Sequence, residues 1–139
     1  TIKKTNTGSQ TIAPTESIFV DGAGNGGTSI TANVTDIDFT EVDDSHGFWN
    51  GTQFTPSVGG RFLVEGFIFM TTSVADLRVD IRIDGGIYKT AGYNVTGTPF
   101  ISFKKVVTMS ANEGMSLTLT RGVTLSNNTN VHHISITRL

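Results

Sequence analysis

Hydrophobic residues occur at every second position through most of the chain, and the three-to-four spacing that marks a helix is almost absent. The segments 77–84 and 115–121 alternate most clearly, with apolar side chains on one face and charged or hydroxyl-bearing ones on the other. Alternation with many β-branched residues is typical of strands. Further strands are expected at 30–39, 61–70, 100–109, 123–126 and 131–139. The pattern predicts an all-β protein.

Turn-forming residues separate these segments. Glycine pairs occur at 59–60 and 85–86, and turns rich in Asn or Gly occur at 111–114 and 127–128. Short strands joined by such turns suggest a sandwich or a jelly roll. No internal repeat and no linker divides the sequence. We therefore expect a single domain of this kind over residues 1–139.

The strand expected at 61–70 is apolar on both faces. One face carries Phe62, Val64, Ile68 and Met70, and the other carries Leu63, Phe67 and Phe69. An antiparallel strand usually has one face in water, so large apolar side chains on both faces indicate a second surface that must be buried. Two explanations stay open: the second face packs against another chain, or loops of the same chain cover it.

Composition and charge exclude several classes of partner. Ten basic and twelve acidic residues give a net charge of −2. The chain therefore lacks the positive patch that binding to nucleic acid or to an anionic membrane requires. No apolar run approaches the roughly 18–20 residues of a membrane span. Cys is absent, which excludes disulfides and thiolate metal sites. We expect no nucleic-acid partner and no membrane span.

Motifs for cofactors, metals or catalysis are weak. Residues 22–27 match the glycine spacing of a dinucleotide-binding loop, but a strand rather than a helix is expected at 28–34. The acidic residues of 36–44 lack EF-hand spacing, so we interpret them as a solvated acidic edge. The adjacent His132 and His133 point to opposite faces of their strand, so at most one of them joins any cluster. We expect no cofactor, no metal and no catalytic residue.

Charged residues alternate along the strand at 77–84. Arg78, Asp80, Arg82 and Asp84 share one face of it. Such a row is typically a solvated ladder of weak ion pairs. The alternative is that Arg78 and Arg82 contact an anionic ligand or a neighbouring subunit.

Several short motifs follow one another in a familiar order. They are Phe39-Thr40-Glu41-Val42, Phe48-Trp49-Asn50, Phe54-Thr55-Pro56, Gly60-Arg61-Phe62-Leu63-Val64 and the strand from 77 to 85. This order resembles the globular-head domain of complement component q and its tumour-necrosis-factor relatives. Asp84 stands where the family has Asn, and 113–117 matches the family's acidic turn only in part. The resemblance covers about residues 30–139.

The resemblance implies a ten-strand jelly roll that assembles as a compact homotrimer. The strand at 61–70 would face the threefold axis, which makes Leu63, Phe67 and Phe69 the expected trimer interface. In the family the aromatic residue at the place of Trp49 is structural, so packing rather than recognition is expected for this side chain.

The composition of the chain, without Cys and rich in Thr, Asn and Gly, is also similar to that of the tip domains of bacteriophage tail fibres and tail needles. There the same jelly roll stands on a trimeric shaft, which would lie upstream of Thr1. The expected function is a non-enzymatic homotrimeric knob at the tail tip of a virion, attaching to a receptor or glycan on the bacterial surface. Two alternatives stay open: a complement-q-like head on the stalk of a structural or signalling protein, and a glycan-active enzyme.

Strand direction predicts where a receptor would bind. If the chain enters at the base and the strand at 61–70 is the third, the connections after odd-numbered strands lie at the apex. These connections are 13–29, 71–73, 110–113 and 126–130. Hydroxyl, amide and carboxylate groups for binding are offered there by Thr71, Thr72, Ser73, Asn112, Glu113, Asn127, Asn128 and Asn130. An extra ribbon at 87–90 would reverse the position of every later loop.

Overall fold

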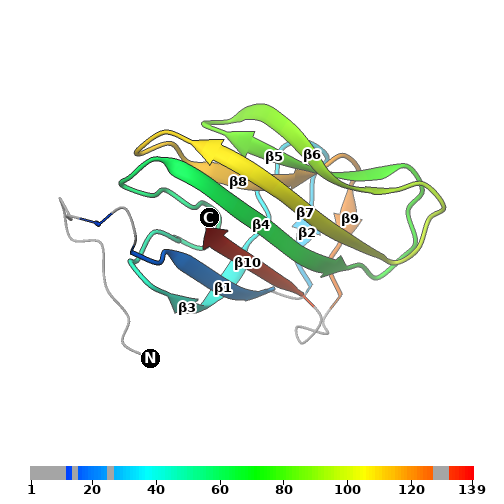
Figure 1. Ribbon diagram of the computed structural model, residues 1–139. Coiled ribbons are helices and arrows are strands. Elements are labelled where there is room, and N and C mark those ends of the chain that lie inside the picture. Colours follow the sequence, from blue (N-terminus) through cyan, green and yellow to red (C-terminus); the bar gives the residue numbers. More distant parts are fainter. Residues whose placement is uncertain (1–11, 14–15, 25–26, 127–131) are drawn as a thin grey trace.

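The structure is a computed structural model, and it describes residues 12–13, 16–24, 27–126 and 132–139. These residues form ten strands and no helix, so they contain no helix that could cross a membrane (Figure 1). The strands are β1 (Phe19–Gly24), β2 (Ser29–Ile30), β3 (Phe39–Asp44), β4 (Gly60–Phe69), β5 (Leu77–Ile83), β6 (Gly86–Asn94), β7 (Phe100–Met109), β8 (Met115–Leu119), β9 (Val123–Thr124) and β10 (His133–Arg138).

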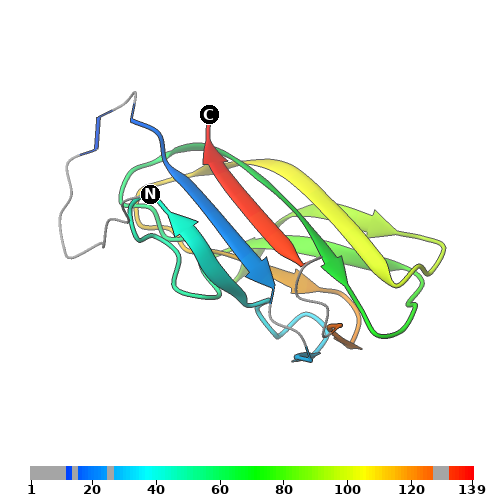
Figure 2. The same cartoon turned by 90° about the horizontal axis from the view of Figure 1, so that it is seen from below.

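Two antiparallel sheets form the sandwich. The larger sheet has the order β3-β1-β10-β4-β7, the smaller one has the order β6-β5-β8, and β2 pairs with β9. Figure 2 shows the five strands of the larger sheet side by side in one layer, with the smaller sheet behind it. The core between the layers includes Val64, Ile81, Leu117 and Ile136, each at most 1% exposed. The prediction of an all-β jelly-roll sandwich is confirmed.

The two longest strands, β4 and β7, lie where the sequence predicts them. β7 spans the expected 100–109, and β4 begins one residue before the expected 61–70 and ends one residue before its end. These two strands pair over their whole length, from Gly60 opposite Met109 to Phe69 opposite Phe100. Their inward side chains are buried, so the local pattern and the core agree.

The region before β4 differs from the prediction in two places. The strand expected at 30–39 is interrupted, because 31–35 form a turn in which Thr35 N–H donates to Thr31 O and Asn33 adopts a φ of 61°. The connection expected at 13–29 contains β1, which lies between β3 and β10. A methyl group on Gly22 would come within 3.1 Å of side-chain carbons of both neighbouring strands, so glycine allows their close approach.

A further strand, β6, follows the hairpin turn at Asp84 and Gly85. Both turn residues have positive φ, 49° and 82°, as a tight two-residue turn requires. The sequence suggests only a ribbon at 87–90, whereas β6 runs over nine residues. Most of its side chains are partly or fully exposed, so it lacks the buried alternating face that reveals a strand in a sequence.

The additional strands change which loops lie together. We call the end of the sandwich that holds Leu139 the C-terminal end, and the opposite end the far end. Leu139 N–H donates to Arg61 O, at the start of β4, whereas Thr71 follows its other end. Since Met109 pairs with Gly60, the loop after β7 lies at the C-terminal end.

The predicted apical set is therefore divided. Thr71, Thr72 and Ser73 lie at the far end, whereas Asn112 and Glu113 lie at the C-terminal end. The expectation that these two loops meet is wrong, because β6 adds one reversal of the chain between them. Asn127, Asn128 and Asn130 lie outside the described residues, between Ser126 and His132.

Candidate functional site

The outer face of the five-stranded sheet, the face turned away from the core, is the first candidate surface. On β4 the inward Phe62, Val64, Ile68 and Met70 are at most 1% exposed. The outward Leu63, Phe67 and Phe69 are only partly buried. The prediction of two apolar faces is confirmed, and loops of the same chain do not complete the burial of the outward face.

Three rings lie in a row across this outer face. Phe67 stacks with Phe100 of β7 at 5.6 Å between ring centroids, and with His133 of β10 at 6.4 Å. The interplanar angles are 20° and 6°. His133 lies directly opposite Phe67 on the neighbouring strand. Side chains in this relation interact across the two strands. We call these three residues the aromatic row.

The row continues as an apolar strip to the edge of the sheet. Ala23 of β1 pairs with His133, and Val42 of the edge strand β3 is 71% exposed. Phe100 at the other side of the row is 43% exposed. Apolar side chains in water on this scale mark surfaces that associate with a partner.

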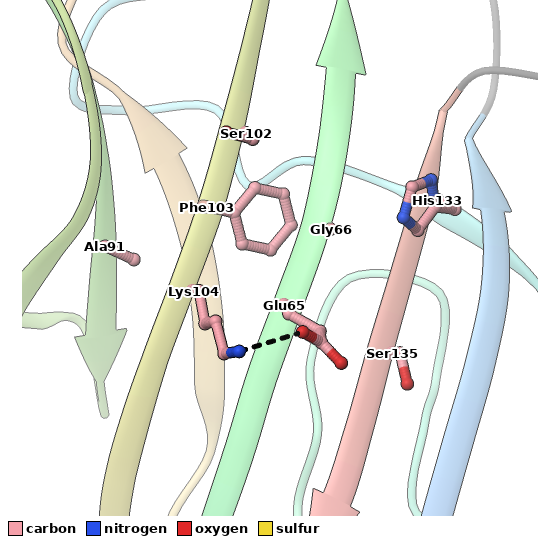
Figure 3. Close-up of a pocket in the computed structure, with 8 residues that line it drawn as sticks. All are labelled: Glu65, Gly66, Ala91, Ser102, Phe103, Lys104, His133 and Ser135. Atoms are coloured by element: carbon pink, nitrogen blue, oxygen red, sulfur yellow. Dashed lines mark ion pairs between the residues drawn. The ribbon is translucent and has the colours of Figure 1, made fainter.

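A hollow of about 430 Å³ lies next to the aromatic row (Figure 3). Its polar groups include Glu65 and Lys104, whose Oε2 and Nζ atoms are 3.9 Å apart. Both side chains are well exposed, so this pair contributes at most about 1 kcal/mol. Gly66 lies beside the pair, and a methyl group here would come within 2.5 Å of the Phe103 ring and 2.2 Å of His133 O. The local structure therefore requires glycine.

The corresponding face of the smaller sheet is polar. Arg82 Nε donates to Thr118 Oγ1 at 2.9 Å, and its Nη1 donates to Gly85 O at 3.0 Å. Thr90 Oγ1 donates to Asp80 Oδ1 at 2.7 Å. The predicted ladder of ion pairs is wrong: Arg82, Asp80 and Asp84 bond to hydroxyl and backbone groups instead of to one another.

At the far end, side chains from two loops and from the end of β6 meet in a cluster that the sequence did not predict. Asp76, with a φ of 56°, accepts hydrogen bonds from Tyr93 Oη at 2.7 Å and Arg121 Nη2 at 3.0 Å. The hydrogen bond from Tyr93, followed by that from Arg121, lowers the pKa of Asp76. The hydrogen bond to Asp76 raises the pKa of Tyr93 above 10.0. Arg78, a predicted ligand contact, is exposed and lies close enough to act electrostatically on both groups.

A Ser-His-Glu chain at the C-terminal end resembles a catalytic group. His46 Nδ1 is 2.7 Å from Ser45 Oγ, and its Nε2 is 2.9 Å from Glu16 Oε1. The His46 side chain is only 3% exposed and its ring stacks on Phe48 at 5.4 Å. A substrate cannot reach this imidazole, so the chain of bonds serves to hold the segment before β1 against the loop after β3.

The expected acidic edge is partly buried. Asp44 is 0% exposed and accepts backbone hydrogen bonds from the four residues 46–49 at 2.9–3.3 Å. The prediction that it is solvated is wrong, because these donors replace water around its carboxylate. No group of three metal-ligating side chains occurs among the described residues.

Trp49 is 6% exposed and donates from Nε1 to Phe39 O, which confirms its packing role.

No family model and no curated protein matches the sequence. Solved structures do match. Murine APRIL at pH 8.0 superposes with a TM-score of 0.71 and 11% identity, over 89% of this chain and 100% of its own. The Eiger TNF of S. frugiperda gives 0.66 and 12%, over 88% and 92%. The globular domain of zebrafish complement 1qA gives 0.66 and 11%, over 88% and 96%. The chain has the fold shared by these tumour-necrosis-factor and complement-q structures.

Proposed function

We propose that this chain is a non-enzymatic head domain that forms a homotrimer through the outer face of its five-stranded sheet. The observation that carries the proposal is the aromatic row with its apolar strip, which a monomer would leave in water. The likeness to tumour-necrosis-factor and complement-q structures supports the same arrangement, since the sequence resemblance implies a trimer in that family. Leu63, Phe67 and Phe69 are then interface residues.

The position of the chain ends supports a defined orientation. Arg138 N–H donates to Ile18 O, so the start of β1 and the end of β10 lie side by side. Any stalk preceding β1 would join the sandwich at this C-terminal end. The far end, with its Thr71–Ser73 loop, would then be presented to a ligand.

The finer proposal is a knob at the tip of a bacteriophage tail needle or fibre, which attaches the virion to a receptor or glycan on the bacterial surface. Support comes from the Cys-free composition rich in Thr, Asn and Gly and from the hydroxyl-bearing loop at the far end. The likeness to the zebrafish complement domain favours a second candidate, a head on the stalk of a structural or signalling protein. Gly-x-y triplets encoded before residue 1 would favour the second candidate, and long heptads the first.

The mass in solution tests the trimer. Multi-angle light scattering should give about three times the 14.8 kDa of the chain. Phe67→Asp should give the monomer mass, because three carboxylates cannot be buried together on an apolar interface. Ile87→Asp, at a 61% exposed aliphatic position of the smaller sheet, is the matched control and should stay trimeric. A monomeric native chain, or a trimeric Phe67→Asp variant, would refute the proposed interface.

Attachment is tested by comparing the two ends. Replacing Thr71, Thr72 and Ser73 together by Ala should weaken binding of the labelled trimer to host bacteria. Replacing Asn112 and Glu113 by Ala, at the opposite end, should leave binding unchanged. Equal loss in both variants, or binding to no bacterial surface, would contradict attachment through the far end.

A further inference from the structure

A second hollow, of about 250 Å³, lies between the loop that joins β6 to β7 and the edge of the outer face. Its walls include Phe67, Tyr93, Val95, Thr96, Phe100 and Ser102. The volume is below the roughly 300–1,000 Å³ typical of drug-sized ligands. It suits a ligand the size of one sugar ring.

The loop that forms one wall is held rigidly. Asn94 is 8% exposed, and its Nδ2 donates to Thr98 O, Thr98 Oγ1 and Phe100 O at 2.6–3.1 Å. Its Oδ1 accepts from Gly97 N–H at 3.0 Å, and Gly97 has a φ of 78° that favours glycine. A ligand that binds here would not have to order the loop, which removes one cost of binding.

Two aromatic residues offer surface for C–H groups. Phe100 is 43% exposed and Tyr93 is 55% exposed. Phe100 is the last ring of the aromatic row: one of its faces lies toward Phe67, and no further ring stacks on the other among the described residues. The flat, weakly polar face of a pyranose packs against such a ring, while its hydroxyl groups need hydrogen-bond partners. Thr96 and Ser102 supply hydroxyl groups of this kind, whereas the Thr98 hydroxyl already accepts from Asn94 Nδ2 and donates to Phe100 O.

The lining carries no ion at neutral pH. It contains no carboxylate, ammonium, guanidinium or imidazole group. Its one titratable group is the phenol of Tyr93, which donates to Asp76 outside the hollow and has its pKa raised above 10.0. A phosphate, an acidic sugar or an amine would lose its hydration here without gaining a counter-charge.

We infer that this hollow binds one neutral pyranose ring of a glycan. The inference deepens the proposed attachment function, on which it rests, by naming the ligand class and a binding place at the far end. Phe67 and Phe100 line the hollow and also belong to the aromatic row, so in the proposed trimer the hollow adjoins the interface, and residues of the β6–β7 loop form its other wall.

The test is an NMR titration of the isotope-labelled protein with methyl glycosides of glucose, galactose, mannose and N-acetylglucosamine, and with N-acetylneuraminic acid. At least one neutral glycoside should shift the amide signals of 93–102, with millimolar affinity of about 1–10 mM, and the acidic sugar should bind more weakly. Absence of shifts with every neutral glycoside at about 50 mM, shifts at another surface, or preference for the acidic sugar would overturn the inference.

Three variants test whether the shifted amide signals arise from glycoside binding in the hollow. Phe100→Ala should weaken binding roughly ten-fold. Thr96→Ala lies on the loop, away from the aromatic row, and should weaken binding without changing the mass, which keeps the test valid if Phe100→Ala perturbs assembly. Val34→Ala, at a 73% exposed position elsewhere, is the control and should bind normally. Unchanged affinity in Thr96→Ala and Phe100→Ala would refute the site.

The two proposals fail in different ways. A trimer that attaches to bacteria but shows no sugar-dependent shifts would refute the pyranose site and leave the proposed function standing. A monomer that shows the shifts would refute the proposed trimer and retain the site.

Discussion

The two sheets of the sandwich bury the same core but present opposite surfaces to the outside. The outer face of the larger sheet carries the aromatic row and neighbouring aliphatic side chains, which remain partly exposed. The outer face of the smaller sheet carries Arg82, which donates to Thr118 Oγ1 and Gly85 O, and Asp80, which accepts from Thr90 Oγ1. These polar groups are thus satisfied within one chain, whereas the apolar side chains of the larger sheet stay in water unless a partner covers them, as the proposed trimer would.

This difference shows that exposure alone does not identify an interface. Arg78 and Leu63 both point away from the core, but only the apolar side chain raises the free energy of the protein when it stays in water. Hydrogen bonds inside the polar face replace those that water would make, so covering it with another chain would add little.

The largest effect on stability is expected at Gly66, where the larger sheet is tightly packed. Gly66→Ala should destabilise the fold by about 3 kcal/mol, because the new methyl group meets a backbone oxygen at 2.2 Å and an aromatic ring at 2.5 Å. Gly86→Ala, on β6 with its nearest contact at 3.6 Å, should change stability by less than about 0.5 kcal/mol. Urea denaturation measures both, and similar midpoints would show that the strand adjusts.

Two isosteric substitutions test the difference between the two faces. One makes a polar side chain of the smaller sheet apolar, and the other makes an apolar side chain of the larger sheet polar. Thr118→Val removes the acceptor of Arg82 Nε, so unfolding free energy should fall by about 1 kcal/mol without any change in assembled mass. Val106 of β7 lies opposite Leu63 on the outer face and is partly buried. Val106→Thr should leave the monomer nearly as stable but raise the concentration at which the trimer dissociates.

Sedimentation equilibrium combined with urea denaturation separates the two outcomes. If Thr118→Val changed the mass and Val106→Thr did not, the assignment of the interface to the larger sheet would be wrong.

The smallest effect is expected at the exposed far-end cluster. Asp76→Asn should lower the pKa of Tyr93 toward 10.0, because the charged acceptor of its hydroxyl proton is lost. In the native chain the lowered pKa of Asp76 contributes stability that is complete above its unfolded value near 3.8 and is lost as pH falls through the folded value. The raised pKa of Tyr93 contributes stability below pH 10.0 that is lost as pH rises through the folded value.

NMR titration of the two Tyr rings measures this change directly. Asp43→Asn, on β3, serves as the control with the same loss of charge. A Tyr93 titration that is identical in the native chain and in Asp76→Asn would show that the hydrogen bond does not persist in solution.

Some of the candidate surface was predictable because it is local. Leu63, Phe67 and Phe69 alternate with core residues on one strand, so their shared face follows from the two-residue period. Their neighbours His133 and Phe100 were not identified, because only the strand order β10-β4-β7 brings them beside Phe67. The far-end cluster of Asp76, Tyr93 and Arg121 was missed for the same reason.

The sequence by itself determined the strand-forming pattern, the sandwich class and the two apolar faces of β4, since these depend on side chains a few positions apart. Tertiary structure decided which strands are neighbours, that a polar segment becomes β6, and that Asn112 and Thr72 lie at opposite ends. The physical reason is that strand pairing joins distant parts of the chain through backbone hydrogen bonds, which every residue except Pro offers alike. Which strand pairs with which is therefore decided by how the whole core packs, and not by any local pattern.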